Sequence, residues 1–361
     1  MLPSLPSEPM RAWLLLFVLH LGCGSGQEPG PSFPGPLGGG GGGAAGMASV
    51  GGSGAAAAAG GHGNEAPAGG SAGSGGMVTM LTLKQPIDRG DGKLVLELGS
   101  TYFEVSPEHG GRVTSLRQGQ QELLTLTGAE NYADAFGSTF WPSPQVWEWP
   151  PPAEIDTDPY EATVDPSGVI SLAGKGNEAT SLRVSKRFSA NLTREAIDIE
   201  YTMTNIGPEP VSWAPWEITR MPAVGLAFWP TGGAPFGETP LAFTSSLGHT
   251  WCDPSHTEGE AKLFADGAGG YLAYVLGDRV LVKRFQDQPA SAVAPGEAEV
   301  EVYVNPDHSY VEIEQQGAYA SIAPGATVAW KVSWYVRKLP PGMVATAGST
   351  DLVAFVVKTL E

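Results

Sequence analysis

From Leu81 onward, apolar and polar residues alternate in short segments that glycine and proline interrupt. Such alternation predicts half-buried β-strands, because successive side chains of a strand point to opposite faces of the sheet. We expect the following strands: 93–98, 102–106, 183–188, 196–204, 271–276, 279–285, 299–304, 309–316 and 328–336. In one of them, Ile197, Ile199, Tyr201 and Met203 would share a buried face.

The spacing of these strands predicts an all-β fold. They recur about every ten residues, as in a sandwich or a barrel. Two of them would form a hairpin around Gly277 and Asp278. Only residues 351–360 have a pattern that a short helix would show. No repeat of 20–50 residues indicates a propeller or a solenoid, so we expect one large β domain.

The N-terminal residues have a different pattern. Residues 12–21 form an apolar run that is too short to span a bilayer but has the length of a signal-peptide core, and Arg11 precedes it. The run ends at Leu21, Gly22 and Cys23, and this ending resembles the lipidation signal of bacterial lipoproteins. An ordinary signal peptide that is cut nearby is the alternative.

We therefore expect three parts: a signal peptide over 1–23, a tether over 24–76, and a folded domain over 77–361. The tether is rich in glycine and alanine, and such a segment buries too little apolar surface to offset the entropy of ordering. A lipid on Cys23 would hold an exported protein on a bacterial membrane, in the outer membrane or the periplasm. No other membrane contact is expected.

The net charge of −18 excludes nucleic acid as a partner, because phosphates need basic residues. It is compatible with neutral sugars, and we expect a monomer. Cys252 is expected to be a buried, unpaired thiol. His249, Cys252 and His256 have the residue types that bind zinc, but a fourth ligand is missing. We expect no metal there, and no phosphate-binding glycine loop or other cofactor motif occurs.

Three segments, in order, resemble the galactose mutarotase-like (aldose 1-epimerase-like) superfamily. They are 104–116 with its Gly110–Gly111 turn; 204–205 with 210–221; and 310–317 with 322–325 and 330–336. The chain is most similar to an uncharacterised bacterial branch, a domain of unknown function, which shares 141–145, 214–217 and 282–285. The resemblance implies a β-supersandwich of two large, mainly antiparallel sheets that binds a sugar on a concave face.

The resemblance also implies a catalytic pair. In mutarotases a glutamate removes the proton of the anomeric hydroxyl, and a histidine donates a proton to the ring oxygen. Glu314 matches the base, but Trp216 stands where the histidine belongs. Because an indole donates hydrogen bonds and does not act as an acid at neutral pH, the resemblance favours sugar binding over epimerisation.

The strand 309–316 supports this assignment independently. Tyr310, Glu312, Glu314 and Gln316 share one face, and Val311 lies on the other. Carboxylates two residues apart on a strand are about 7 Å apart. At an effective dielectric constant of ~20, their repulsion costs roughly 2 kcal/mol and raises one pKa by about 1–2 units. The alternative is a polar face in contact with solvent.

Aromatic residues beside these carboxylates predict a sugar site, since pyranose faces stack on aromatic rings. We expect the following residues to bind the ligand: Trp141, Gln145, Trp216, Glu217, Arg220, Lys283 and Glu312. Tryptophan on a strand is more often core, and we expect this of Trp330 and Trp334. The leading hypothesis is a surface-tethered carbohydrate-binding protein. The alternatives are a mutarotase-like aldose epimerase with Glu314 as the base, and a structural or interaction domain without a ligand.

Overall fold

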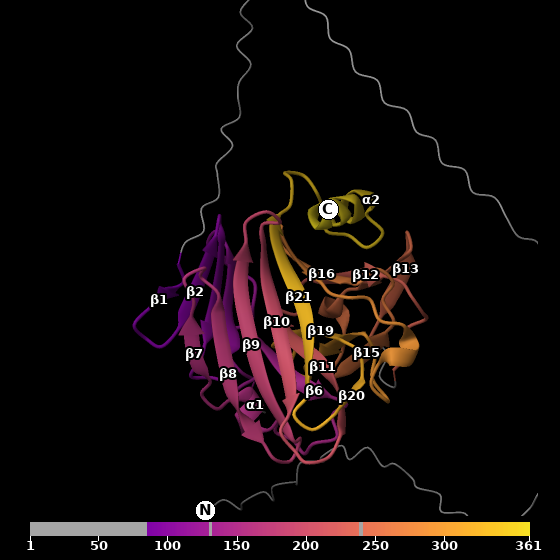
Figure 1. The fold of residues 1–361 in the computed structure, drawn as a ribbon. Coiled ribbons are helices and arrows are strands. Elements are labelled where there is room, and N and C mark those ends of the chain that lie inside the picture. The colour runs from indigo at the N-terminus through magenta and orange to yellow at the C-terminus, as the bar shows by residue number, and fades with distance from the viewer. Residues whose placement is uncertain (1–84, 130–131, 238–240) are drawn as a thin grey trace, which may run out of the picture. The chain divides into compact units, whose positions relative to one another are not determined.

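The computed structural model describes residues 85–129, 132–237 and 241–361, and every structural statement below refers to these ranges. The predicted signal peptide with Cys23, the predicted tether over 24–76 and the first residues of the predicted domain, 77–84, lie outside them. The described residues form two large sheets in which all strand pairs are antiparallel, so the predicted all-β sandwich of two sheets is confirmed (Figure 1).

Sheet 1 contains eleven described strands. They are β1 (Ile87–Asp88), β2 (Leu94–Leu98), β3 (Thr101–Ser106), β4 (Arg112–Gln118), β5 (Gln121–Glu122), β6 (Ser138–Ser143), β11 (Val211–Met221), β15 (Ala261–Ala265), β18 (Val300–Val304), β19 (Val311–Gln316) and β20 (Ala320–Ile322). Their order is β1-β2-β3-β4-β6-β11-β19-β18-β15, while β5 pairs with β4 and β20 pairs with β11.

Sheet 2 contains ten described strands. They are β7 (Glu161–Val164), β8 (Ile170–Asn177), β9 (Leu182–Asn191), β10 (Ala196–Asn205), β12 (Leu226–Pro230), β13 (Phe243–Ser246), β14 (His249–Cys252), β16 (Tyr271–Leu276), β17 (Arg279–Arg284) and β21 (Thr327–Lys338). Their order is β13-β14-β12-β16-β17-β21-β10-β9-β8-β7, and Figure 1 shows β7 to β10 and β21 side by side.

The strands that were expected from alternation are present. Ile197, Ile199, Tyr201 and Met203 of β10 are all buried on one face, as predicted. The hairpin of β16 and β17 turns at Gly277, whose φ of 61° suits glycine. Strands such as β13, with all four residues exposed, have no apolar alternation and were not predicted.

The main core lies between the two sheets. Phe103 of sheet 1 contacts Phe188 and Trp334 of sheet 2, with ring centroids 5.6 and 5.7 Å apart. Phe140 stacks on Tyr201 at 4.6 Å. These contacts identify the inner face of each sheet, and the expectation that Trp330 and Trp334 are core residues is confirmed by their burial.

The helices cover parts of the sandwich. The longer one, α2 (Thr350–Leu360), begins at a Ser349 cap, whose hydroxyl accepts a hydrogen bond from the Leu352 N–H. Its Leu352 and Val356 belong to an apolar cluster with the outward-facing side chains of sheet 2, Val280 among them. The short α1 (Ala153–Asp156) lies against Gly110, where a Cβ would stand 1.9 Å from the Asp156 carbonyl oxygen. Two 3₁₀ turns, Pro254–His256 and Ala290–Ala292, complete the elements.

A buried ion pair crosses the core. Lys283 Nζ lies 2.9 Å from Glu217 Oε1, and both side chains are fully buried. The Glu217 carboxylate also accepts hydrogen bonds from the Tyr201 hydroxyl (2.6 Å) and the Trp334 indole (3.0 Å). Gln315 donates to the same carboxylate at 2.5 Å. The pair therefore joins β11 and β19 of sheet 1 to β10, β17 and β21 of sheet 2.

We predict that Lys283→Met lowers the free energy of unfolding by about 3–5 kcal/mol, because it leaves the Glu217 carboxyl group without its cation in the core. The double variant Glu217→Met, Lys283→Met should lose less than the single variant, since it removes both charges. Urea unfolding of the three proteins measures this. A double variant that is less stable than Lys283→Met would contradict the prediction.

Candidate functional site

The face of sheet 1 that points away from sheet 2, here called the outer face, carries a polar and aromatic patch. Alternation along β11 and β19 creates it. Glu217 of β11 points into the core, so its neighbour Trp216 points outward. Antiparallel pairing sets Trp216 opposite Gln316 and Arg220 opposite Glu312. Glu314 lies between them on the same face.

We call this patch the outer-face cluster. It spans β6, β11, β19, β18 and β15, which are neighbours in the sheet. Its members are Trp141, Trp216, Arg220, Lys262, Glu301, Glu312, Glu314 and Gln316. All but Lys262 are buried, so the predicted shared face of Glu312 and Glu314 is confirmed, but it is not a face in contact with solvent.

Glu314 is the centre of one half of the cluster. The Trp216 indole N–H donates to Glu314 Oε2 at 2.8 Å, and Lys262 Nζ lies 3.4 Å from the same oxygen. Lys262 also pairs with Glu301 at 2.6 Å. Gln316 donates through Nε2 to Glu301 at 2.7 Å. The Trp216 indole and Lys262 therefore hold the Glu314 carboxylate from two sides of the sheet's central strands.

Arg220 is the centre of the other half. Its Nε lies 2.8 Å from Glu312 Oε1. Its guanidinium carbon lies 5.4 Å from the ring centroid of Trp141 and 5.7 Å from that of Tyr310. The Trp141 indole in turn donates to Asp156 of α1 at 2.9 Å. Cation–π contacts and a buried ion pair thus hold the guanidinium in one orientation.

The buried carboxyl groups of the cluster have raised pKa values. Burial raises the pKa of Glu301, Glu312 and Glu314 to about 7 each. The charge of Glu314 raises the pKa of Glu312 further, which agrees with the repulsion expected from their spacing, although burial is the larger cause. Burial lowers the pKa of Lys262, but its attraction to Glu301 and Glu314 outweighs this and raises it overall.

Three polar atoms of the cluster point to no partner. They are Arg220 Nη1, Glu314 Oε1 and Gln316 Oε1, each buried and without a hydrogen bond to any described residue. Buried polar atoms in proteins are nearly always hydrogen-bonded, because leaving one unpaired costs about 1–3 kcal/mol. One donor and two acceptors on adjacent strands are therefore left without a hydrogen-bond partner among the described residues.

Aromatic side chains flank the cluster. Trp141 contacts Trp216, Trp147 and Trp149 edge-on, with centroids 5.4, 5.6 and 5.9 Å apart. Trp149 also contacts Tyr132 at 4.8 Å, and it remains 52% exposed. The buried indoles of Trp141 and Trp216 pack at the edge of the cluster, while the ring of Trp149 is exposed to solvent.

Three of the predicted ligand-binding residues lie elsewhere. Glu217 and Lys283 form the ion pair between the sheets, which corrects the expectation that they line the sugar-binding face. Glu217 could not share a face with its sequence neighbour Trp216. Gln145 lies on an exposed loop, where its backbone N–H donates to Glu297 Oε1 at 3.2 Å.

Sequence reasoning missed Lys262 and Glu301. Both sit at outward positions of alternating strands, Lys262 between the buried Ala261 and Leu263, and Glu301 between Val300 and Val302. The alternation indicates that the side chains of Lys262 and Glu301 point away from the core. Their meeting with Glu314 depends on the pairing of β15 with β18 and of β18 with β19, which no local pattern indicates.

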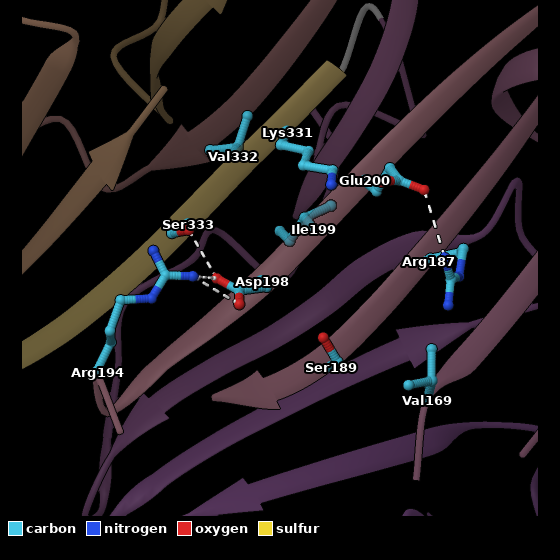
Figure 2. A pocket seen from close by; sticks show the side chains of 10 residues that line it. All are labelled: Val169, Arg187, Ser189, Arg194, Asp198, Ile199, Glu200, Lys331, Val332 and Ser333. Carbon is cyan, nitrogen blue, oxygen red and sulfur yellow. Dashed lines mark hydrogen bonds and ion pairs between the residues drawn. The ribbon is translucent and has the colours of Figure 1, made fainter. Parts of the chain in front are cut away.

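Sheet 2 has a hollow of about 370 Å³ on its own outward face (Figure 2). Its basic groups have partners. Arg194 binds Asp198 through two contacts of 2.7 Å, while Arg187 and Lys331 lie 3.5 and 3.2 Å from Glu200. Because these charges satisfy one another, we assign the candidate site to sheet 1.

Three further observations concern the described residues. They contain no group of three or more His, Cys, Asp or Glu side chains arranged to hold a metal ion. Within the same ranges, no helix has both the length and the apolarity to cross a bilayer. Cys252 is a buried free thiol as predicted, and burial raises its pKa.

We predict that the protein loses stability as the pH rises from about 5 to about 8. A carboxyl whose pKa is raised on folding stabilises the protein fully below its unfolded pKa, and this contribution disappears as the pH passes the folded pKa of about 7. Glu314→Gln should flatten the profile by on the order of 1–3 kcal/mol. Glu258→Gln, at an exposed position, is the control for urea unfolding at each pH. An equal slope in wild type and Glu314→Gln would refute the prediction.

Comparison with known proteins concerns the fold. Residues 246–337 match a family described as Domain of unknown function (DUF4380), and no curated protein matches the sequence. A TPR-domain containing protein from Parabacteroides distasonis is similar at 15% identity and a TM-score of 0.50, over 71% of this chain and 49% of that one. The chain thus spans about half of the length of that protein.

Two smaller proteins are similar along nearly their whole length. A galactose mutarotase-like protein from Clostridium acetobutylicum is 10% identical with a TM-score of 0.46, over 72% of this chain and 99% of that one. Another from Lactobacillus casei is 11% identical with a TM-score of 0.46, over 68% and 100%. At these identities the likeness concerns the fold alone.

Proposed function

We propose that the protein binds a carbohydrate at the outer-face cluster. The observation that carries the proposal is the set of buried, unpartnered atoms on two adjacent strands: Arg220 Nη1, Glu314 Oε1 and Gln316 Oε1. A sugar hydroxyl both donates and accepts hydrogen bonds, so neighbouring hydroxyls of one ring could satisfy the donor and both acceptors. Ligand sites in proteins fix the orientation of the ligand through a small number of polar groups among apolar and aromatic side chains.

The aromatic residues support a saccharide rather than another polar ligand. Trp149 exposes half of its surface beside the buried Trp141, so an apolar pyranose face could stack there while its hydroxyls reach the cluster. The galactose mutarotase-like names of the structural neighbours agree with a sugar, although they describe those proteins and not this one.

The geometry favours binding over epimerisation. Glu314 Oε1 has no partner among the described residues and could take a proton, so the base alone does not distinguish the two functions. The residue that the resemblance aligns with the acid is Trp216, whose indole donates to Glu314 Oε2 and cannot protonate a ring oxygen. Binding needs neither group to exchange protons.

Glu314→Gln should weaken sugar binding about ten- to a hundredfold, because a charge-assisted hydrogen bond contributes about 1.5–3 kcal/mol. The full chain is first screened on a glycan array, and the affinity for the best glycan is then measured by calorimetry. Glu200→Gln on sheet 2 is the matched control and should bind like wild type. Unchanged affinity of Glu314→Gln would reject the site. A chain that binds no glycan would favour a structural or interaction domain.

Trp216→His tests the enzyme alternative, since it restores the residue type of the acid beside Glu314. We expect no anomer exchange by wild type and measurable exchange by Trp216→His when the bound sugar is followed by NMR. The melting temperature shows whether the variant folds. Exchange that wild type already catalyses, and that Glu314→Gln abolishes, would make the protein an epimerase.

We also propose that the protein is exported and anchored by a lipid on Cys23, which lies outside the described residues. The support is the apolar run that ends at this cysteine. Labelled fatty acid should be incorporated into wild type, and Cys23→Ser should move the protein to the soluble fraction. A Cys23→Ser protein that stays bound to the membrane would argue against the anchor.

A further inference from the structure

The outer face of sheet 1 has a hollow of about 490 Å³, which none of the outer-face cluster residues lines. We call it the β3–β4 hollow. Its floor is formed by outward side chains of these two strands, namely Tyr102, Glu104, Thr114, Ser115 and Arg117. Its volume is within the range that small-molecule sites have.

The two carboxylates of the hollow are satisfied from within the protein. Glu104 accepts hydrogen bonds from Arg89 (2.7 Å), Lys93 (3.0 Å), Tyr102 (2.7 Å) and Thr114 (2.8 Å). Burial opposes the charged form, but these bonds together lower the pKa of Glu104 to about 2. It is therefore a fixed anion that two cations surround.

Glu122, the other carboxylate, faces backbone groups. Its Oε1 accepts from the N–H groups of Leu116, Leu123 and Leu124 at 2.9–3.1 Å, and its Oε2 accepts from the Ser115 hydroxyl at 2.5 Å. Arg117 is its cross-strand neighbour, yet no ion pair joins the two side chains in the described part of the chain. Both oxygens of Glu122 are thus hydrogen-bonded to groups other than the arginine.

Arg117 is consequently a cation without a carboxylate partner among the described residues. Its guanidinium carbon lies 3.7 Å from the ring centroid of Tyr102, and its Nε is buried without a hydrogen bond to any of them. A guanidinium that stacks on a ring keeps its N–H edges in one plane, which suits a planar or tetrahedral anion. The hollow is lined by three basic residues, Arg89, Lys93 and Arg117, and by only two carboxylates. It therefore has an excess of basic groups in a chain whose net charge is −18.

We propose that the β3–β4 hollow binds the acidic group, a carboxylate or a sulfate, of a charged saccharide. Arg117 would hold the anion, and the Tyr102 and Ser115 hydroxyls lie on the same floor. The inference rests on the proposed function, because the hollow and the outer-face cluster share one face of sheet 1. The hollow of sheet 2 in Figure 2 differs, since each of its basic groups already has a carboxylate partner.

The test is calorimetric titration of the full chain with three probes: trigalacturonate, its fully methyl-esterified form, and a sulfated galactose trisaccharide. We expect wild type to bind at least one acidic probe about tenfold or more tightly than the neutral ester. Which acidic probe binds identifies the carboxylate or the sulfate as the preferred group. Added salt should weaken the acidic probe alone.

Arg117→Gln should abolish this preference, and Arg117→Lys should keep part of it, because lysine retains the charge but not the planar edge. Arg187→Gln on sheet 2 is the matched control and should keep the full preference. Melting temperatures show that each variant is folded. Equal affinity of wild type for acidic and neutral probes, or an unchanged preference in Arg117→Gln, would overturn the inference, as would binding of none of the three.

The two proposals fail in different ways. Glu314→Gln should weaken all three probes by a similar factor and leave the acidic preference as it is. If Glu314→Gln weakens every probe but no acidic preference exists, the outer-face site stands and the β3–β4 hollow falls. If the preference exists and depends on Arg117 while Glu314→Gln has no effect, the hollow stands and the outer-face site falls.

Discussion

Each charge buried in sheet 1 must have a partner, and the arrangement of the central strands depends on this requirement. Taking an ion out of water costs several kcal/mol, which only a well-placed counter-charge and hydrogen bonds can offset. The middle strands β11 and β19 carry polar side chains on both faces. Glu217 meets Lys283 on the inner face, and on the outer face Arg220 meets Glu312. These pairs are satisfied only in one register of the two strands and one position of sheet 2.

The polar networks differ in how completely they are satisfied. Asp156 accepts from Arg112, Thr139, Tyr132 and Trp141, and these contacts hold its pKa at about 2 despite its burial. It serves as a rigid support behind Trp141. The carboxyl groups of the outer-face cluster have fewer donors, and their pKa values are raised instead. A complete network stabilises the fold, whereas an incomplete one leaves bonds that a ligand can make.

Alternation predicted most of the strands of the fold. It also predicted which side chains of β19 share the face of the candidate site. It indicated the long strands and the common face of Glu312 and Glu314, because a period of two is a local property. The same rule places Trp216 and Glu217 on different faces of sheet 1. It also places Lys283 and Val282 on different faces of sheet 2, and Val282 packs in the outward cluster that includes α2. What it could not predict is which strands become neighbours. Lys262, Glu301 and the covering loop around Tyr132 reach the site only through long-range pairing.

The strand order determines how late in its synthesis the chain can fold. The central strand β11 pairs with β19, where Trp216 faces Gln316, and β10 pairs with β21, where Ile197 faces Trp334. Neither sheet can close before the last part of the chain has been synthesised. Folds with such distant pairings fold slowly, since a long loop must close before the contacts form. The nascent polypeptide can therefore complete neither sheet until β19 and β21 have been synthesised.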